Sequence, residues 1–373
     1  MTNVIIIDIK GVITNSGYDV ISRHDAYGDA LKRLNPDSQL YIVSRKKSSN
    51  QILTKNMEII YAKSLLGFLK KSRKLLRSLE GSTLLVSGDP WESFLACTII
   101  RKISKKQVPI QVQLHADVGS KNWRELNWGN RTRSISTPFS LKRAEQIRCV
   151  TGTQLANLEM ILPTARSKTI VIPVPIKIES DRNNKRKSKH SYSISIVGRI
   201  HRDRGLEEFV RVCKVLADSF PNLRIIIVGE GPDEGWLRSA LRDRDLLERS
   251  NFTGFINQQE LSLMWQTFGC VASFAPSEAY GRTAREALIY GVPVLAKRSS
   301  GIEELAQNYD QKGIWIIDGL NDDAIRNLFN LVSGFIVGKD VSESIIRTVN
   351  SLNEELAKSW IIGSKLPMLK SSR

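Results

Sequence analysis

Two acidic side chains, Glu278 and Glu286, flank seven residues in the segment 275–305, APSEAYGRTAREALIYGVPVLAKRSSGIEEL. A carboxylate supplies two acceptor oxygens, which suits the neighbouring hydroxyls of a diol. This spacing arises by chance in most proteins, so the pair carries weight only through the residues around it. The alternative interpretation of the pair is structural: Glu286 would be a solvated helix residue, and Glu278 would be the neighbour of a helix cap.

Between the two glutamates, Tyr280 and Gly281 lead into a predicted helix. A glycine loop at a helix start leaves backbone N–H groups unpaired and exposes the positive end of the helix dipole, so it suits a diphosphate. Gly281, Arg282 and Thr283 are the candidate phosphate cradle. The sequence YGVPVLA at 290–296 then predicts the turn and buried strand that complete the unit.

A second candidate segment is SIVGRIHRDRGLEEFV at 195–210, in which a predicted strand runs into a basic loop. Arg199 follows the strand and Arg204 precedes the next helix, so both could neutralise charge on a bound phosphate. The competing interpretation is a surface loop whose basic residues are incidental. Two further segments follow in order, VGEGPDEGWL at 228–237 and FTGFINQQEL at 252–261.

These four segments, in this order, resemble the donor-binding half of the family 4 glycosyltransferases, and the resemblance covers residues 195–305 closely. It implies that Glu286 accepts hydrogen bonds from the ribose hydroxyls of a nucleotide sugar. It implies that Glu278 holds hydroxyls of the transferred sugar, and it adds Tyr280 to the donor-binding residues.

The resemblance further implies that Arg199 and Arg204 lie beside the donor phosphates. Arg204 stands where the family usually has lysine, which keeps the charge but replaces a compact ammonium with a planar guanidinium. The segment that contains Phe255 resembles the one whose backbone meets the nucleobase in this family.

The first half of the chain is more divergent. LHAD at 114–117 follows a predicted strand and resembles the family's His-x-Asp segment, which places His115 near the reacting sugar. The alternative is a structural histidine at a strand end. The segment 16–34 resembles a loop that faces the donor phosphates and the acceptor, and Gly17 is carried over although the usual double glycine is absent.

The resemblance implies transfer with retention of anomeric configuration, in which the departing phosphate takes the proton of the acceptor hydroxyl. Glu278, His115 and Arg199 are the predicted catalytic residues, because they would stabilise an oxocarbenium-like state and the departing charge. No D-x-D motif follows a predicted strand. We therefore expect leaving-group stabilisation without a metal ion, and no cofactor besides the nucleotide-sugar co-substrate.

Apolar strand-like runs alternate with helix-like segments, which predicts an α/β protein with doubly wound parallel sheets. The runs lie at 4–9, 39–44, 83–88, 110–115 and 169–174, and then at 193–198, 224–229, 250–255, 270–275, 292–297 and 313–318. The basic stretch 180–190 between the two sets is predicted to be a linker. We expect two Rossmann-like domains facing across a cleft, the GT-B architecture. The acceptor-binding domain is expected at 1–180 and the nucleotide-sugar-binding domain at 190–355, with 356–373 packing back onto the first.

The 373-residue chain carries a formal net charge of +17 with a pI near 9.8, which favours an anionic partner. In the segment 62–80 an apolar stripe recurs at helical spacing, formed by Leu65, Phe68, Leu69, Leu76 and Leu79. Beside it lie the cations Lys70, Lys71, Arg73, Lys74 and Arg77. Such a helix can lie on an anionic membrane surface, which would favour a lipid-linked acceptor. The alternative is a helix whose stripe packs on the first sheet.

Three other function classes share some of these features with glycosyltransferases. The charge also suits a nucleic-acid-binding protein, but no helix-turn-helix, zinc finger or RNP-like strand is evident, so we expect no nucleic-acid partner. An epimerase- or phosphorylase-type GT-B enzyme shares the fold without this transferase activity, and a catalytically silent binder of nucleotide sugars is the third alternative.

Two further features concern the compartment. No run approaches the roughly 18 apolar residues of a membrane span, and the four scattered cysteines indicate a reducing compartment. We expect a cytoplasmic retaining hexosyltransferase. If the basic helix at 62–80 lies on the membrane, the enzyme would be a peripheral protein at the inner face of the membrane. Its acceptor would be a carbohydrate or lipid-linked molecule in cell-surface polysaccharide or glycolipid synthesis.

Overall fold

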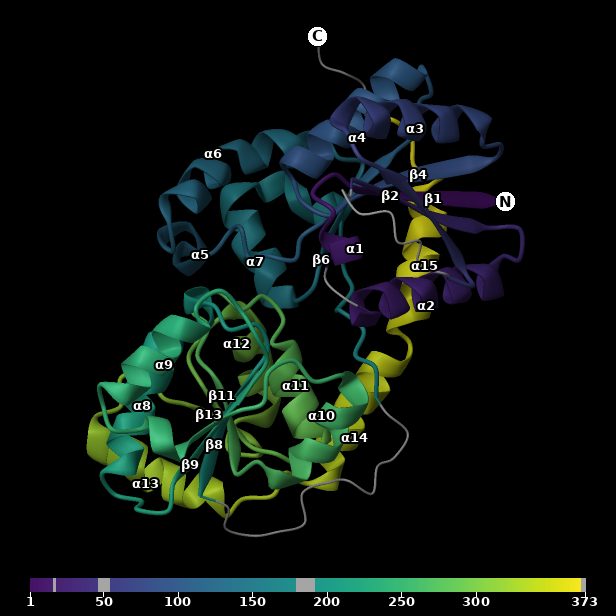
Figure 1. The fold of residues 1–373 in the computed structure, drawn as a ribbon. Helices are drawn as coiled ribbons and strands as arrows, with labels where there is room; N and C mark the ends of the chain where they lie inside the picture. The colour runs from purple at the N-terminus through teal and green to yellow at the C-terminus, as the bar shows by residue number, and fades with distance from the viewer. Residues whose placement is uncertain (16–17, 46–53, 179–191, 370–373) are drawn as a thin grey trace. The chain divides into compact units, whose positions relative to one another are not determined.

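The computed structural model describes residues 1–15, 18–45, 54–178 and 192–369. It divides the chain into unit 1, Met1–Pro175 with Asn350–Arg373, and unit 2, Ile176–Val349. Each unit is a parallel sheet packed with helices (Figure 1). The predicted α/β class with two doubly wound sheets is therefore confirmed, while the predicted linker at 180–190 lies outside the described residues.

The sheet of unit 1 has the strand order β3-β2-β1-β4-β5-β6-β7, and all neighbours are parallel. Its strands are β1 Thr2–Asp8, β2 Gln39–Arg45, β3 Met57–Ala62, β4 Ser82–Ser87, β5 Ile110–Gln113, β6 Gln146–Cys149 and β7 Thr169–Val171. The chain runs outward through β2 and β3 and then returns to the other side of β1 with β4. This reversal defines a doubly wound sheet.

Strands β3 and β6 lie outside the predicted apolar runs. β3 is an edge strand, and several of its side chains are partly exposed. β6 is buried although its sequence, QIRC, is polar. The guanidinium of Arg148 donates to the carbonyl oxygens of Ile172 at 2.9 Å and Pro173 at 2.7 Å, and to Gln113 Oε1 at 3.1 Å. These acceptors allow a charged side chain in the interior, which apolar periodicity cannot reveal.

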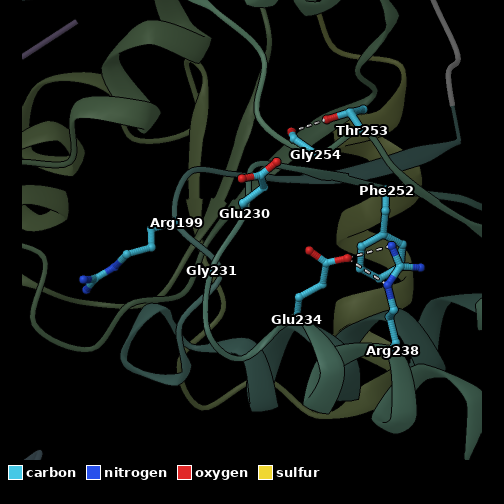
Figure 2. A pocket seen from close by; sticks show the side chains of 8 residues that line it. All are labelled: Arg199, Glu230, Gly231, Glu234, Arg238, Phe252, Thr253 and Gly254. Atoms are coloured by element: carbon cyan, nitrogen blue, oxygen red, sulfur yellow. Dashed lines mark hydrogen bonds and ion pairs between the residues drawn. The ribbon is translucent and has the colours of Figure 1, made fainter. Parts of the chain in front are cut away.

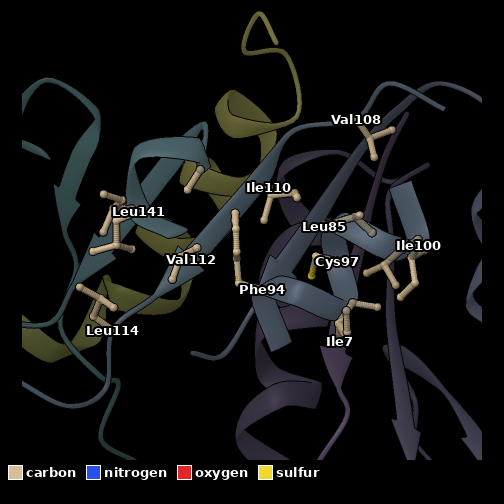
Figure 3. Packing of buried hydrophobic residues seen from close by; sticks show 14 of the residues in the cluster. Ile7, Leu85, Phe94, Cys97, Ile100, Val108, Ile110, Val112, Leu114 and Leu141 are labelled. Atoms are coloured by element: carbon tan, nitrogen blue, oxygen red, sulfur yellow. The ribbon is translucent and has the colours of Figure 1, made fainter. Parts of the chain in front are cut away.

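The helices of unit 1 are α1 Val12–Asn15, α2 Tyr18–Leu34, α3 Leu65–Ser78, α4 Glu92–Ser104, α5 Lys121–Glu125, α6 Trp128–Arg143, α7 Gly152–Ile161 and α15 Leu352–Gly363, with a 3₁₀ helix η1 at Pro163–Lys168. Helix α4 shows how they meet the sheet. Its side chains Phe94, Cys97 and Ile100 belong to one buried cluster with Ile7 of β1 and Leu85 of β4 (Figure 3).

The burial of side chains in helix α3 distinguishes the two interpretations of the apolar stripe in 62–80. Phe68 and Leu76 are fully buried, Leu79 is nearly so, and Leu69 packs against the same core. The stripe therefore packs inward from Phe68 onward, whereas Leu65 at the start of α3 is 46% exposed. The five cations of α3 are also exposed. No helix within the described ranges is both long enough and apolar enough to span a membrane.

Helix α15 returns the chain to unit 1, which it re-enters at Asn350 rather than at the expected residue 356. Trp360 is fully buried, and its indole N–H donates to Gln111 Oε1 of β5 at 2.9 Å. The same indole meets the ring of Tyr27 in α2 edge-on, with 5.9 Å between ring centroids. The C-terminal helix is thus part of the core of unit 1.

The sheet of unit 2 has the order β10-β9-β8-β11-β12-β13, also parallel throughout. Its strands are β8 Ser193–Val197, β9 Arg224–Val228, β10 Ser250–Phe252, β11 Cys270–Ser273, β12 Val294–Ala296 and β13 Ile314–Ile316. Its helices are α8 Leu206–Ala217, α9 Glu234–Arg242, α10 Gln258–Met264, α11 Arg282–Ile289, α12 Ser300–Tyr309, α13 Asp322–Ser333 and α14 Lys339–Asn350, with the 3₁₀ turns η3 Arg202–Arg204, η4 Leu247–Arg249 and η5 Trp265–Thr267. Each of the six predicted runs in this half contains one strand.

We expect Trp360→Ala to lower the free energy of unfolding of unit 1 by about 3–5 kcal/mol, because it empties a buried indole site and removes one of the donors to Gln111 Oε1. Ile362→Ala is the matched control, since Ile362 lies on the same helix and is 60% exposed; it should change stability by less than about 0.5 kcal/mol. Urea unfolding followed by circular dichroism measures both. Equal effects would contradict the docking of α15.

Candidate active site

The candidate site lies at the carboxyl ends of the strands of unit 2, where the strand order reverses. β8 is flanked by β9 on one side and by β11 on the other. The chain therefore leaves β8 and β11 in opposite directions along the sheet, and open α/β sheets bind ligands at such a point. Most of the predicted site residues fall in the loops that follow these two strands.

The loop after β11 turns around the carboxylate of Glu278. Glu278 Oε1 accepts the backbone N–H groups of Tyr280 at 3.3 Å and Gly281 at 3.1 Å. Gly281 adopts φ 73°, a left-handed conformation that favours glycine, and α11 begins at the next residue. The first amides of α11, including those of Arg282 and Thr283, have no acceptor within the helix. This end of the helix therefore suits an anion.

An ion pair joins this loop to the loop after β8. Arg204 Nη1 lies 2.8 Å from Glu278 Oε2. Arg204 ends the turn η3 and is followed by Gly205, where a Cβ atom would lie only 2.3 Å from the carbonyl oxygen of Phe274. Glycine at this position lets the two backbones approach closely enough for the pair to form. Both carboxylate oxygens of Glu278 are thus held by donors of unit 2.

Glu278 is ionised at neutral pH for a specific reason. Burial is the largest single influence and by itself raises the pKa of its carboxyl group. The charge of Arg204 and the N–H groups of Gly281 and Tyr280 together outweigh burial, so the pKa of Glu278 lies below its usual value. An ionised carboxylate only accepts hydrogen bonds, which suits it to hydroxyl groups of a ligand.

Glu286 lies one turn further along α11 and is only 4% exposed. Arg282 Nε donates to Glu286 Oε1 at 2.8 Å. Thr283 Oγ1 lies 3.5 Å from the carbonyl oxygen of Val197, the last residue of β8. Glu286 is therefore not the solvated helix residue of the alternative interpretation, and its carboxylate has a defined orientation.

A cavity of about 750 Å³ opens on the β9–β10 side of the switch point (Figure 2). It is lined by Arg199, Glu230, Gly231, Glu234, Arg238, Phe252, Thr253 and Gly254. Arg199 is well exposed and pairs with Asp203, with 3.3 Å between its Nη2 and the carboxylate Oδ2. In Figure 2 its guanidinium is directed away from Glu230 and Glu234. Arg199 and Arg204 thus pair with different carboxylates, Asp203 and Glu278.

The other walls of the cavity contain side chains that we did not predict. The guanidinium of Arg238 lies over the ring of Phe252, 3.7 Å from its centroid, and contacts Glu234 Oε1 at 2.7 Å. Glu230 Oε1 accepts the backbone N–H of Phe255 at 3.1 Å, while the Phe255 ring is exposed. The third and fourth sequence segments indicated these loops, but spacing does not tell which side chains face the cavity.

Arg285 is a further residue that sequence reasoning missed. It is buried beneath the loop after β11, where its guanidinium lies over the ring of Tyr280 at 3.9 Å and contacts Glu304 Oε1 at 3.2 Å. Burial lowers the pKa of Arg285, and Tyr280, Glu304 and Glu278 offset part of this effect. An arginine in a helix carries no signal that distinguishes such a buried support from a solvated side chain.

Two predicted residues lie outside this cluster. His115 belongs to unit 1, where it follows Leu114 beyond the end of β5, and its side chain is exposed. Its position next to the reacting sugar stays a prediction. Gly17 lies outside the described residues.

Comparisons with known proteins show what the chain is similar to. A family model described as glycosyl transferases group 1 matches residues 177–333. This match lies within unit 2 and shows what that part of the chain is similar to. The 2-deoxystreptamine N-acetyl-D-glucosaminyltransferase of Niallia circulans is 26% identical over 140 residues, which cover 37% of this chain and 36% of that protein. The alpha-monoglucosyldiacylglycerol synthase of Acholeplasma laidlawii is 24% identical over 136 residues, 36% of this chain and 33% of that protein.

These sequence matches span about a third of the length of both relatives. Solved structures align with nearly the whole chain. Sucrose-phosphate synthase from Thermosynechococcus elongatus has a TM-score of 0.78 at 16% identity and covers 97% of this chain and 99% of its own. Anabaena Alr3699/HepE in complex with UDP-glucose has a TM-score of 0.70 at 15% identity, with 96% and 99% covered. At such identities the likeness shows the fold, which is that of GT-B glycosyltransferases.

The site in unit 2 combines carboxylates, guanidinium groups and helix amides. Such a set can hold a diphosphate together with several hydroxyl groups. Among the described residues, no group of three or more His, Cys, Asp or Glu side chains is placed to hold a metal ion. Independence from metal stays a prediction, because a metal ion can also be brought with the phosphates of a substrate.

We expect Gly231→Ala to destabilise unit 2 by roughly 1–3 kcal/mol, because the new Cβ would lie 2.0 Å from the carbonyl oxygen of Ile200 and must displace backbone. Gly235→Ala is the matched control. It lies four residues away in α9 with nothing within 4 Å of the new Cβ, so it should stabilise by about 0.5–1 kcal/mol. Urea unfolding tests this difference in sign, and a stabilised Gly231→Ala protein would contradict the close loop contact.

The ion pair at Glu278 predicts a pH dependence of stability. Because the pKa of Glu278 is lowered from 4.5 by folding, its ionised form stabilises the protein above pH 4.5, and this contribution is lost as the pH falls through the folded pKa. The Tm difference between wild type and Glu278→Gln should therefore be largest near neutral pH and shrink in acid. Glu207→Gln, which breaks an exposed pair with Arg202, is the control and should change Tm little at any pH. A difference at Glu278 that grows in acid would contradict the assignment.

Proposed function

We propose that the chain is a retaining glycosyltransferase that moves a hexosyl group from a nucleoside diphosphate sugar to a carbohydrate or lipid-linked acceptor. The observation that supports this proposal most directly is the Arg204–Glu278 ion pair at the N-terminus of α11. There a carboxylate, a guanidinium and helix amides meet at the switch point of the sheet. They match the hydroxyls of a donor sugar and the charge of its diphosphate.

Glu278, in the loop before α11, and Glu286, in α11, contact different parts of the donor. Glu278 accepts hydrogen bonds from the transferred sugar, and Glu286, oriented by Arg282, accepts them from the ribose. The nucleobase lies towards the cavity, where Phe255 and its loop provide backbone groups. The complex of the Anabaena relative with UDP-glucose supports a nucleotide-sugar donor.

The chemical step depends on charge that develops as the glycosidic bond breaks. Arg199, Arg204 and the N-terminus of α11 stabilise the departing diphosphate without a metal ion. The acceptor hydroxyl attacks from the face that the diphosphate leaves, and its proton passes to the departing phosphate, so the configuration is retained. Glu278 and His115 stabilise the positive charge that develops on the sugar ring.

The acceptor is a glycan or lipid-linked molecule of cell-surface polysaccharide or glycolipid synthesis. The name of the Acholeplasma laidlawii relative, a monoglucosyldiacylglycerol synthase, supports a lipid acceptor. The five exposed cations of α3 support peripheral attachment at the cytoplasmic face of an anionic membrane. Because the stripe of α3 packs inward, this helix contributes charge to such attachment.

A thermal-shift screen of the full chain against UDP, GDP, ADP and CMP, with and without Mg²⁺, tests the donor site. A ligand that binds only the folded protein raises its apparent stability. We expect one nucleoside diphosphate to raise Tm without Mg²⁺, and Glu286→Gln to reduce this shift because an amide is a poorer acceptor for the ribose hydroxyls than a carboxylate.

Glu248→Gln is the control for this screen, since Glu248 is exposed on η4 and lies outside the site loops. It should respond to nucleotide as the wild type does. No shift with any nucleotide, together with tight binding of duplex DNA, would replace the proposal with the nucleic-acid alternative. Nucleotide binding without transfer to any acceptor would favour a GT-B protein without transferase activity.

A further inference from the structure

Helices α4 and α6 of unit 1 expose large apolar side chains in regular stripes. In α4 these are Leu95, Ile99 and Ile103, four residues apart, so they share one helix face. In α6 they are Trp128, Ile135 and Phe139, which are 78%, 70% and 64% exposed. Their separations of seven and four residues also place them on one face. Single exposed apolar residues are ordinary, but two aligned stripes mark a contact surface.

The charge of α6 is as one-sided as its apolar stripe. Its sequence, WGNRTRSISTPFSLKR, contains four basic residues and no acidic one. Arg131, Lys142 and Arg143 are exposed beside the stripe, while Asn130, Thr137 and Leu141 are buried on the inner face. A helix with an exposed aromatic stripe, flanking cations and no carboxylate has the composition of helices that lie in a lipid–water interface.

Helices α3, α4 and α6 form one layer. They connect β3 to β4, β4 to β5 and β5 to β6, steps in one direction along the sheet, and right-handed crossovers place such helices on the same face. Arg73 Nε of α3 donates to the carbonyl oxygen of Ile103 at 3.0 Å. The indole N–H of Trp91, which precedes α4, donates to the carbonyl oxygen of Arg133 at 3.2 Å. α4 therefore lies between the other two (Figure 1).

Helix α3 contributes a second set of cations to this layer. Four of them, Lys70, Arg73, Lys74 and Arg77, line a groove of about 520 Å³ together with Ser78. The sequence of α3 contains no acidic residue. In α4 the single acidic residue, Glu92, is already paired with Lys10 and Arg133. The layer thus presents apolar stripes bordered by cations without a competing exposed carboxylate on α3 or α6.

We propose that the outer surface of α3, α4 and α6 lies on an anionic lipid bilayer. The side chains of Trp128, Ile135 and Phe139 enter the boundary between headgroups and acyl chains, together with the stripe of α4. The cations of α3 and α6 contact the lipid phosphates. This inference rests on the proposed function for its purpose, since it brings the acceptor-binding unit to lipid-linked substrates. It moves the apolar contact from α3, where the sequence predicted it, to α4 and α6.

Flotation of the full chain with lipid vesicles tests the proposal. We expect binding to vesicles that contain phosphatidylglycerol to exceed binding to pure phosphatidylcholine by roughly tenfold or more. The triple variant Trp128→Ser, Ile135→Ser, Phe139→Ser should lose most of this binding, because serine removes the inserted area but leaves every cation in place. The double variant Leu331→Ser, Ile362→Ser is the matched control: it removes exposed apolar residues on α13 and α15 and should bind as the wild type does.

A separate variant tests the role of the cations. Lys70→Gln, Lys74→Gln and Arg77→Gln together should weaken binding to the anionic vesicles and reduce its dependence on salt. Equal binding by the wild type and the serine variant would overturn the role of α6. Absence of anionic-vesicle binding by the wild type would overturn the membrane partner. The membrane partner would also be overturned if analytical sedimentation showed that the stripe joins two copies of the chain.

Nucleotide-induced thermal shifts of the same samples separate this inference from the proposed function. The serine variant should keep the shift of the wild type, which also shows that it folds. A normal shift without vesicle binding overturns only the membrane surface. Vesicle binding without any nucleotide response overturns the proposed function and leaves the surface in place.

Discussion

The ion pair between Arg204 and Glu278 holds together the two loops that leave the switch point of the second sheet. A partly buried pair is maintained only when each remaining donor and acceptor is satisfied. Here one carboxylate oxygen takes Arg204 and the other takes two backbone N–H groups. The start of α11, the position of Glu286 along it and the orientation of its first amides all follow from this arrangement.

The pair in turn depends on glycines at which backbones nearly touch. A Cβ atom on Gly205 would collide with Phe274, and one on Gly301 would lie 2.4 Å from the carbonyl carbon of Tyr280. At Gly229 the neighbour is the carbonyl oxygen of Gly198, only 2.1 Å from the position of a Cβ. The site is therefore a set of loops packed backbone against backbone, and its side chains extend from a framework with little room for adjustment.

The two units use their charge differently. In unit 2 the arginines of the site are neutralised by carboxylates within a few ångströms, as Arg282 is by Glu286. In unit 1, helices α3 and α6 carry cations without acidic partners on the same helix. The net charge of +17 is thus not evenly spread as a solubility feature. Cations on helices without carboxylates of their own, beside exposed apolar stripes, fit one face of unit 1 to an anionic surface.

The sequence by itself determined the fold class, the strands of unit 2 and the loops that carry the site. Period-two and buried apolar runs, and the glycine before α11, are local signals that act within a few residues. It did not reveal β6, because Arg148 is buried by acceptors more than twenty residues away in the chain. It left two interpretations of the α3 stripe and of Glu286, since the same pattern suits a surface or a core.

Only the tertiary structure decided those choices, because burial and pairing depend on which distant segments lie alongside. It showed that Arg204 pairs with Glu278 while Arg199 lies at the cavity, although spacing treats the two arginines alike. It also showed that Phe68 and Leu76 of α3 face inward, and that α4 and α6 each expose an apolar stripe in addition to their buried residues. A helix sequence defines its own apolar face, but the sheet against which it packs determines whether that face meets protein or solvent.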